Sequence, residues 1–264
     1  YKRQPRLHPM RAVTWNVNSL RPRLERVMGF LQRHEPDLVC LQETKCTDEQ
    51  FPREAFEEAG WHLAVHGQKT YNGVAILSRE PASDPVTDIP GLDDPQRRIL
   101  AATVGGVRIV NLYVVNGSEV GSEKFEYKLH WLERVTAWLE DEMKQHENVV
   151  VLGDFNIAPD DRDVYDPEAW REKILCSTPE REALQRILGL GLVDTFRLFE
   201  QEERTWSWWD YRMNMFRRKL GLRIDLVLAS EALSKSCTAS YIDIEPRRQE
   251  RPSDHAPAIA EFKL

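Results

Sequence analysis

The sequence predicts an α/β fold in which two β-sheets pack face to face and helices cover their outer faces. About ten segments have the apolar pattern of strands, whereas few have the length and spacing of helices. Some predicted strands adjoin as hairpins and others are joined through a helix. This mixture disfavours a purely parallel, doubly wound sheet and favours two mixed sheets.

The first half of the chain begins with a strand and a helix and continues mostly as strands. The first strand is predicted at residues 10–17. Apolar residues between positions 24 and 31 then recur at i, i+3, i+4 and i+7, which indicates an amphipathic helix with Pro22 near its first turn. Further strands are expected at residues 37–41, 61–66, 73–78, 99–104 and 107–115, with a Gly105-Gly106 hairpin turn before the last.

The second half contains the longest predicted helix and the most apolar strand. Residues 124–145 have one apolar stripe, and Trp131 and Trp138 beside it are expected to pack in the core. The run at residues 149–152 is too short for a helix and rich in β-branched residues, so it predicts a strand buried on both faces. The other expected elements are a polar loop at 160–166, a helix at 178–188, and strands at 204–208, 224–229, 241–244 and 256–262.

Composition limits the class of protein. Of the 264 residues, 41% are hydrophobic and 30% charged, and no apolar run approaches the roughly 18 residues of a membrane span. No signal peptide opens the sequence, and no repeat or linker divides it. We therefore expect a flexible N-terminal arm at residues 1–9 and a single domain at residues 10–264. The four cysteines have no CxxC spacing, which disfavours zinc and favours free thiols in the cytoplasm.

The net charge of −7 argues against binding nucleic acid by bulk attraction, but it permits a local basic face. Such a face could come from a basic cluster within twelve residues, namely Arg212, Arg217, Arg218, Lys219 and Arg223. An acidic total with a local basic cluster suits an enzyme that gathers carboxylates around a metal and holds phosphates at its rim. Charge alone does not decide between classes.

Polar side chains recur at the ends of the predicted strands, where loops on a rigid scaffold commonly build sites. They are Asn16, Asn18, Glu43, Asp154, Asn156, Asp225, Asp254 and His255. Acids and amides with one histidine suit Mg²⁺ or Mn²⁺ better than zinc. No nucleophile elbow and no Gly-rich phosphate loop is evident. The pattern predicts metal-assisted hydrolysis, in which a cation on Glu43 neutralises phosphate charge while a base and an amide position water.

Two of these features also have ordinary structural explanations. An isolated Gly153-Asp154-Phe155-Asn156 is better explained as an Asx-turn that closes a strand. His255 lies close to Pro257 and could simply satisfy loop hydrogen bonds. Because polar residues recur at several other strand ends, we favour a functional site over a simple turn for Gly153-Asp154-Phe155-Asn156. His255 could also be functional, since Asp225 could orient its other imidazole nitrogen as a carboxylate–imidazole pair.

Eight motifs extend these observations over residues 10–264. They are WNVN at 15–18, LQETK at 41–45, NGVA at 72–75, GDFN at 153–156, GLVDTFR at 191–197, WSWWDYR at 206–212, GLRID at 221–225 and SDHAP at 253–257. Each motif is weak alone, but together and in this order they are highly specific. The chain thereby resembles the bacterial exonuclease III-type apurinic/apyrimidinic (AP) endonucleases of the endonuclease/exonuclease/phosphatase superfamily.

The resemblance implies a four-layer α-β-β-α sandwich with a metal at one end of the strands. Glu43 would be the main ligand of Mg²⁺, or of Mn²⁺, with Asn16, Asn18 and Asp254 near the ion.

The resemblance also implies catalytic roles. Asp154 would activate or orient the attacking water, and Asn156 would hold the scissile phosphate. His255, paired with Asp225, would contact or polarise that phosphate. Tyr113 would bond the phosphate or assist the leaving group, although without the resemblance it is simply an aromatic strand residue.

For DNA, the resemblance implies a pocket and a phosphate grip. Trp208, Leu222 and Ile224 would wall a pocket for a flipped-out sugar that lacks its base, because flipping costs least where no base pair is broken. The basic cluster would hold backbone phosphates without sequence specificity. Trp206 is expected in the core.

One departure from the family pattern lies after Tyr113. The family commonly has a proline before an amide and a glycine, whereas this chain has Val115 before Asn116-Gly117. Two glutamates follow within residues 118–123. The rigidity of this loop and the DNA contact of Asn116 are therefore left open, as is the balance between endonuclease and exonuclease activity.

The activity implied is that of a divalent-metal-dependent DNA repair phosphodiesterase. It would cut double-stranded DNA 5′ to abasic sites, leaving a 3′-hydroxyl, and trim 3′ ends as an exonuclease and phosphatase. We expect a cytoplasmic monomer, associated with the nucleoid when acting, with no membrane partner.

The alternatives are a predominant 3′–5′ exonuclease, a general DNase or phosphoinositide phosphatase of the superfamily, and an inactive DNA-binding member. Trp208, Leu222 and the basic cluster argue against the general hydrolases. An inactive member is disfavoured because the full set of polar site residues is present, namely Glu43, Asp154, Asn156, Asp225 and His255.

Overall fold

The computed structural model describes residues 9–264 and contains two six-stranded sheets packed face to face. In spatial order, the first sheet comprises β11 (Cys237–Ile242), β12 (Ala258–Lys263), β1 (Pro9–Asn16), β2 (Leu38–Gln42), β4 (Val74–Ser78) and β3 (His62–His66). The second comprises β5 (Ser83–Val86), β6 (Ile99–Val104), β7 (Val107–Tyr113), β8 (Val149–Asp154), β10 (Asp225–Ser230) and β9 (Leu192–Asp194). Both sheets are mixed, because β1 with β2 and β7 with β8 are parallel pairs among antiparallel ones.

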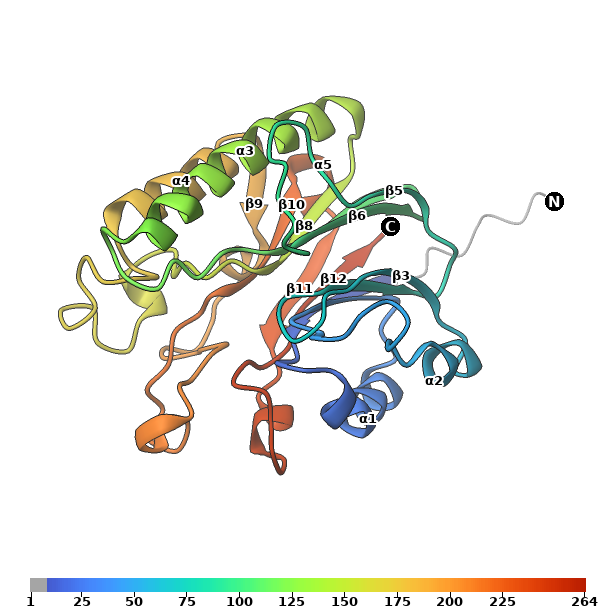
Figure 1. Ribbon diagram of the computed structural model, residues 1–264, viewed down its shortest axis with the longest axis horizontal. Coiled ribbons are helices and arrows are strands. Elements are labelled where there is room, and N and C mark those ends of the chain that lie inside the picture. Colours follow the sequence, from blue (N-terminus) through green and yellow to red (C-terminus); the bar gives the residue numbers. More distant parts are fainter. Residues whose placement is uncertain (1–8) are drawn as a thin grey trace.

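Helices cover the outer face of each sheet, so the layers run helix, sheet, sheet, helix (Figure 1). The helices are α1 (Leu24–His34), α2 (Arg53–Glu58), α3 (Glu123–Gln145), α4 (Thr178–Leu188) and the single-turn α5 (Glu231–Ser234). Short 3₁₀ turns occur at Arg21–Arg23, Asp161–Asp163, Thr195–Leu198, Arg212–Asn214 and Glu245–Arg248. In Figure 1, α3 and α4 lie on one side, and α1 and α2 on the other. The predicted four-layer α-β-β-α sandwich is confirmed.

The central strand β8 shows why the sequence lacks alternation in this part of the chain. Val149 and Val151 pack in the apolar layer beneath α3 and α4, whereas Val150 and Leu152 pack between the two sheets. A strand covered on both faces needs apolar residues at every position. Trp131 and Trp138 are buried, as predicted for core residues.

Elements with a strong period are present at the predicted positions. The strand at residues 99–104 and the helix at residues 178–188 have the predicted ends. The strand predicted at residues 204–208 is wrong, because in this segment Trp208 makes only isolated bridges, to Leu222 and His255. The strands β5 and β9 were not predicted, because they are too short to show the alternation of apolar and polar residues that indicates a strand.

The predicted N-terminal arm lies outside the described residues, except for Pro9, which begins β1. The single-domain organisation of residues 10–264 stays a prediction. The four cysteines are free, as expected. Among residues 9–264, no helix combines the length and apolar character needed to cross a membrane.

Candidate active site

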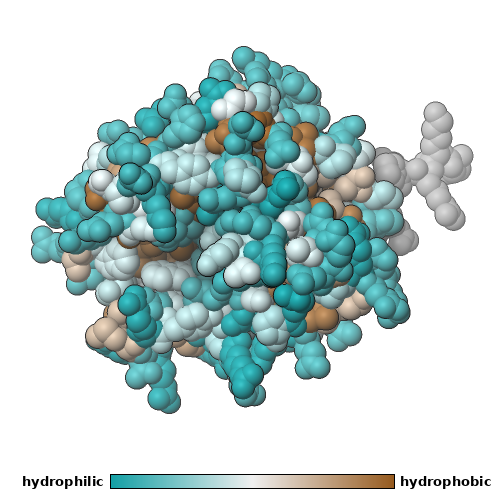
Figure 2. Space-filling model, in the orientation of Figure 1, coloured by the Kyte–Doolittle hydropathy of each residue, from teal (hydrophilic) through white to brown (hydrophobic). Residues whose placement is uncertain are grey.

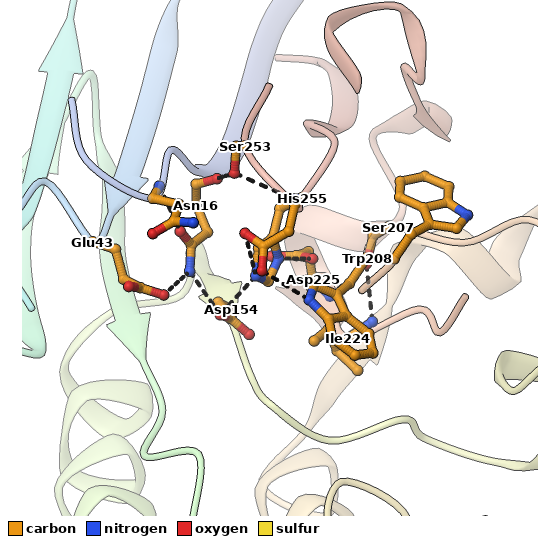
Figure 3. Close-up of polar contacts among 12 residues, drawn as sticks. Asn16, Glu43, Asp154, Ser207, Trp208, Ile224, Asp225, Ser253 and His255 are labelled. Atoms are coloured by element: carbon orange, nitrogen blue, oxygen red, sulfur yellow. Dashed lines mark hydrogen bonds and ion pairs between the residues drawn. The ribbon is translucent and has the colours of Figure 1, made fainter. Parts of the chain in front are cut away.

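The ends of four strands bring the predicted polar residues together across the two sheets (Figure 3). Asn16 ends β1, and Glu43 follows β2 in the first sheet. Asp154 ends β8 and lies opposite Asp225, the first residue of β10, in the second sheet. The Asn16 amide Nδ2 donates to Glu43 Oε1 at 2.8 Å and to Asp154 Oδ2 at 2.9 Å. One side chain therefore joins the acids of the two sheets.

His255 lies between two buried carboxylates. Its Nδ1 is 2.8 Å from Asp225 Oδ2, and its Nε2 is 3.6 Å from Asp154 Oδ2. Burial opposes the imidazolium, but Asp225, Asp154 and Asp254 outweigh it and raise the pKa of His255 well above its ordinary value. Burial raises the pKa of Asp154 to about 7, although His255 acts in the opposite direction. The predicted carboxylate–imidazole pair is thus present, beside a carboxyl that titrates near neutral pH.

Asn156 has a constrained backbone. Its φ is 47°, in the left-handed region, and its N–H donates to Asp154 Oδ1 at 3.0 Å. This is the Asx-turn considered from the sequence, so the structural explanation of the motif holds alongside any catalytic one. The side-chain Nδ2 donates to the Val114 carbonyl at 2.8 Å, and Asn116 Nδ2 lies 3.4 Å from Asn156 Oδ1. Gly153 is required because a Cβ there would lie 1.9 Å from the Leu112 carbonyl oxygen.

Tyr113 ends β7 and is buried beside Glu43. The Arg98 guanidinium lies over its ring, 4.7 Å from the centroid. Burial, and then the charges of Glu43 and Asp154, raise the pKa of Tyr113 well above its ordinary value, so the phenol is a hydrogen-bond donor at neutral pH. Burial acts to raise the pKa of Glu43, but the Asn16 amide, Lys45 and His255 together lower it, so Glu43 is ionised.

Lys45 is a site residue that the sequence reasoning missed. Its Nζ lies 3.4 Å from Glu43 Oε2 and donates to Asn18 Oδ1 at 2.7 Å. Asn18 also donates from Nδ2 to the Tyr211 hydroxyl at 3.2 Å, so it lies at the rim. The signal was present, because Lys45 is part of LQETK and follows Glu43 by two positions.

Two serines, also missed, fix the positions of larger groups (Figure 3). Ser207 Oγ accepts from the backbone N–H groups of Ile224 and Asp225 at 2.9 and 3.0 Å. Ser253 Oγ donates to the Asn16 carbonyl at 2.6 Å and accepts from the His255 N–H at 3.2 Å. Both serines lie in motifs noted in the sequence, WSWWDYR and SDHAP, but the sequence does not show which backbone groups their hydroxyls bind.

The donor chemistry of this site fits a divalent cation. Asp154 and Asp225 offer carboxylate oxygens within 4.8 Å of each other, beside His255, and Asn16 links Glu43 to Asp154. Asp254 Oδ2 accepts from Trp208 Nε1 at 3.1 Å. Within residues 9–264, Asp225 Oδ1 and Asp254 Oδ1 are buried without a hydrogen-bond partner. Unpartnered carboxylate oxygens among clustered acids are the ligands that hard cations prefer.

The predicted pocket for a base-free sugar requires a correction. Leu222 and Ile224 are 0% and 1% exposed, so neither presents a surface to a ligand in this structure. They are buried in an apolar cluster with Val164 and other residues of the loop before α4, and Trp208 packs against this cluster. Trp208 alone of the three retains exposed surface. Trp206 is buried, as expected.

The basic cluster divides into two kinds of residue. Arg212, Arg217, Arg218 and Lys219 are exposed on one loop. Arg223 is fully buried between Asp163 and Asp194, at 2.7 and 2.6 Å, so the prediction that it holds DNA phosphates is wrong. Its guanidinium already forms ion pairs with these two carboxylates.

The face of the molecule seen in Figure 2 is mainly hydrophilic, with hydrophobic residues in small separate areas.

Comparisons with known proteins agree with this geometry. The model of the Endonuclease/Exonuclease/phosphatase family matches residues 13–255. Exodeoxyribonuclease III of Haemophilus influenzae is 35% identical over 267 residues, covering 96% of this chain and 100% of the relative. The solved structure of the 3′ phosphatase NExo from Neisseria, bound to a product DNA hairpin, is 50% identical, with a TM-score of 0.95 and coverage of 97% and 100%. An AP endonuclease from Archaeoglobus fulgidus is 37% identical, with a TM-score of 0.92 and the same coverage.

Proposed function

The chain belongs to the endonuclease/exonuclease/phosphatase family, and we propose that it is a DNA repair nuclease that hydrolyses phosphate esters at abasic sites and at 3′ ends. The observation that carries the proposal is the convergence of Glu43, Asp154 and His255, joined through Asn16 and Asp225. Incision 5′ to an abasic site leaves a 3′-hydroxyl, and the same groups serve 3′–5′ exonuclease and 3′-phosphatase reactions. The relatives named exodeoxyribonuclease III, 3′ phosphatase and AP endonuclease support this range.

Divalent-metal dependence is typical of the family, and we assign the ion as Mg²⁺, with Mn²⁺ as a substitute. Glu43 and the free oxygens of Asp225 and Asp254 are the groups that would hold it, with Asn16 and Asn18 nearby. When bound, the ion neutralises charge on the phosphate oxygens.

The side chains divide the remaining work. Asp154, with a pKa of about 7, accepts a proton from the attacking water, which suits a general base at neutral pH. Asp225 holds the His255 imidazolium, whose Nε2–H donates to a phosphate oxygen. The Asn156 amide and the Tyr113 hydroxyl donate to the same phosphate. Donors fixed before the reaction stabilise the growing charge without reorganisation.

Double-stranded DNA is the proposed partner, bound by a monomer. Arg212, Arg217, Arg218 and Lys219 lie exposed on one loop and hold backbone phosphates, while Trp208 contacts the sugar. Asn116, exposed beside Asn156, contacts the next phosphate. The cytoplasmic location stays a prediction.

One observation favours a second candidate, a predominant 3′-end-processing enzyme. Leu222 and Ile224 are buried beneath Trp208, so a base-free sugar has only Trp208 to contact unless the loop before α4 moves. A terminal 3′-phosphate needs no such pocket.

The test is a side-by-side assay with Mg²⁺ on three matched duplexes, carrying an internal abasic site, a recessed 3′-hydroxyl or a 3′-phosphate. Turnover of the abasic duplex and of either 3′-end duplex supports the proposal, and the ratio of rates ranks the two candidates. Turnover confined to the two 3′-end duplexes establishes the second candidate in place of the first. Inactivity on all three, in protein whose folding is verified by circular dichroism, contradicts both.

A further inference from the structure

A fully buried ion pair lies directly behind Asn156. Lys128 of α3 and Glu180 of α4 contact each other, and both side chains are 0% exposed. Lys128 Nζ also donates to the carbonyl oxygens of Asn156, at 2.6 Å, and of Asn116, at 3.2 Å. An ammonium has three N–H donors, so every donor of Lys128 has an acceptor.

These contacts constrain a left-handed backbone. The left-handed backbone of Asn156 is a conformation that few residues other than glycine, asparagine and aspartate adopt, and contacts on both sides of the residue fix it here. The Asn156 N–H is held by Asp154 Oδ1, and its carbonyl is held by Lys128. With both ends of the residue fixed, the side-chain amide has one direction, between Val114 and Asn116.

Glu180 carries the constraint into a neighbouring loop. Its Oε1 accepts from the Leu175 N–H at 3.0 Å, and its Oε2 accepts from the N–H and hydroxyl of Ser177 at 3.1 and 2.6 Å. The Leu175 carbonyl in turn accepts from the N–H of Ala158, two residues beyond Asn156. One ion pair thus joins α3, α4, the Asn116 loop and the turn after β8.

Stability alone does not account for this pair, because apolar residues of similar volume often stabilise a core equally well or better. We propose that Lys128 is a positioning residue for phosphoester hydrolysis. Its ammonium holds the Asn156 backbone left-handed, so that the Asn156 amide is directed at the phosphate. The inference rests on the proposed role of Asn156.

The test replaces the whole pair, because removing one charge leaves the other buried and unpaired. The variant is Lys128→Met with Glu180→Leu. The matched control is Arg108→Met with Glu142→Leu, which removes another buried pair, with side chains 4% and 9% exposed, near the far end of α3. Both variants are assayed below their melting temperatures. The first lowers kcat about a hundredfold with KM little changed, since small misplacements of a catalytic group cost that much. The control retains the kcat of the wild type.

The same pair is also replaced in an Asn156→Ala background. If Lys128 acts through Asn156, the double replacement lowers kcat no further in that background, since residues that act as a unit are not additive. An equal loss in both backgrounds, or an equal loss in the Arg108–Glu142 control, would overturn the inference.

Two further measurements keep the inference testable. Lys128→Gln with Glu180→Gln removes both charges together and keeps hydrogen-bonding groups at both positions, so it is a milder replacement than Met with Leu, and it gives a smaller kcat loss of the same kind. A crystal structure of the soluble variant with the largest loss of kcat gives the φ of Asn156. This measurement does not depend on which DNA the protein cleaves. An unchanged left-handed Asn156 would overturn the inference, whereas a folded wild type that cleaves none of the duplexes contradicts the proposed function instead.

Discussion

At the scale of single residues, Asp154 is held where its charge is unfavourable. Burial raises its pKa from 3.8 to about 7, so the folded protein binds a proton that the unfolded chain releases over this range. The contribution of Asp154 to stability is therefore lost as the pH rises towards 7. Such a cost is typical of groups retained for chemistry.

We predict that Asp154→Asn separates activity from stability. Loss of the base lowers single-turnover hydrolysis by about 10²–10⁴-fold on every duplex that the wild type cleaves. Because the amide carries no charge to bury, the variant melts at or above the wild-type temperature at pH 8 in EDTA, by differential scanning calorimetry. Wild-type rates in this variant would refute the assignment of Asp154 as the base.

Arg217 and Arg223 show where residue-level prediction fails. Both belong to one basic cluster in the sequence, yet Arg217 is exposed and Arg223 is buried. The partners that bury Arg223 are Asp163 and Asp194, 60 and 29 positions away. Motifs located Glu43 and Asp154 because their neighbours along the chain are distinctive. The role of Arg223 depends on distant residues that no local pattern identifies.

At the scale of elements, the loop between β7 and α3 carries the departure from the family pattern at Val115. Asn116 lies 3.4 Å from Asn156, so this loop borders the proposed phosphate site. Glu119 and Val120 are exposed on it. In the proposed complex, a carboxylate at this position would repel the DNA backbone rather than hold it.

We predict that Glu119→Lys lowers the KM for duplex DNA and steepens its salt dependence. Each new phosphate contact adds about 0.9 to the slope of log affinity against log salt concentration. The control is Glu147→Lys, which makes the same charge change at another exposed residue, beyond the far end of α3. Fluorescence anisotropy in Ca²⁺ at several salt concentrations measures both. Equal slopes in the two variants would show that the loop does not contact DNA.

Elements were predictable where apolar residues recur with the period of a helix or a strand. They were not predictable where tertiary contacts, rather than such a period, determine the backbone. The helix at residues 178–188 has both an apolar stripe and a capping box at Ser177, and its ends were predicted correctly. Residues 204–208 are rich in aromatics but are held by isolated bridges, so β-propensity there was misleading. Extended aromatic segments without a ladder resemble strands in sequence alone.

At the scale of the whole molecule, the site exists because two sheets end at the same place. Asn16 and Glu43 come from the first sheet, and Asp154 and Asp225 from the second. The face-to-face packing of two sheets and the chemistry were predictable from strand patterns and motifs, whereas the side-chain contact of Asn16 with Glu43 and Asp154 between the sheets was not. That contact concentrates carboxylates at one point in a protein whose net charge is already −7.

This concentration leads to the last prediction, which concerns metal removal. EDTA abolishes hydrolysis and Mg²⁺ restores it, because the phosphate charge is otherwise unneutralised. Mg²⁺ also raises the melting temperature, since an ion that binds only the folded state stabilises it by about 2.7 kcal/mol at a hundred times its Kd. Glu43→Gln removes an ionised ligand and shrinks this thermal shift, whereas Glu57→Gln, on the exposed surface of α2, leaves it unchanged. Full activity in EDTA, or equal shifts in the two variants, would show that Glu43 holds no catalytic ion.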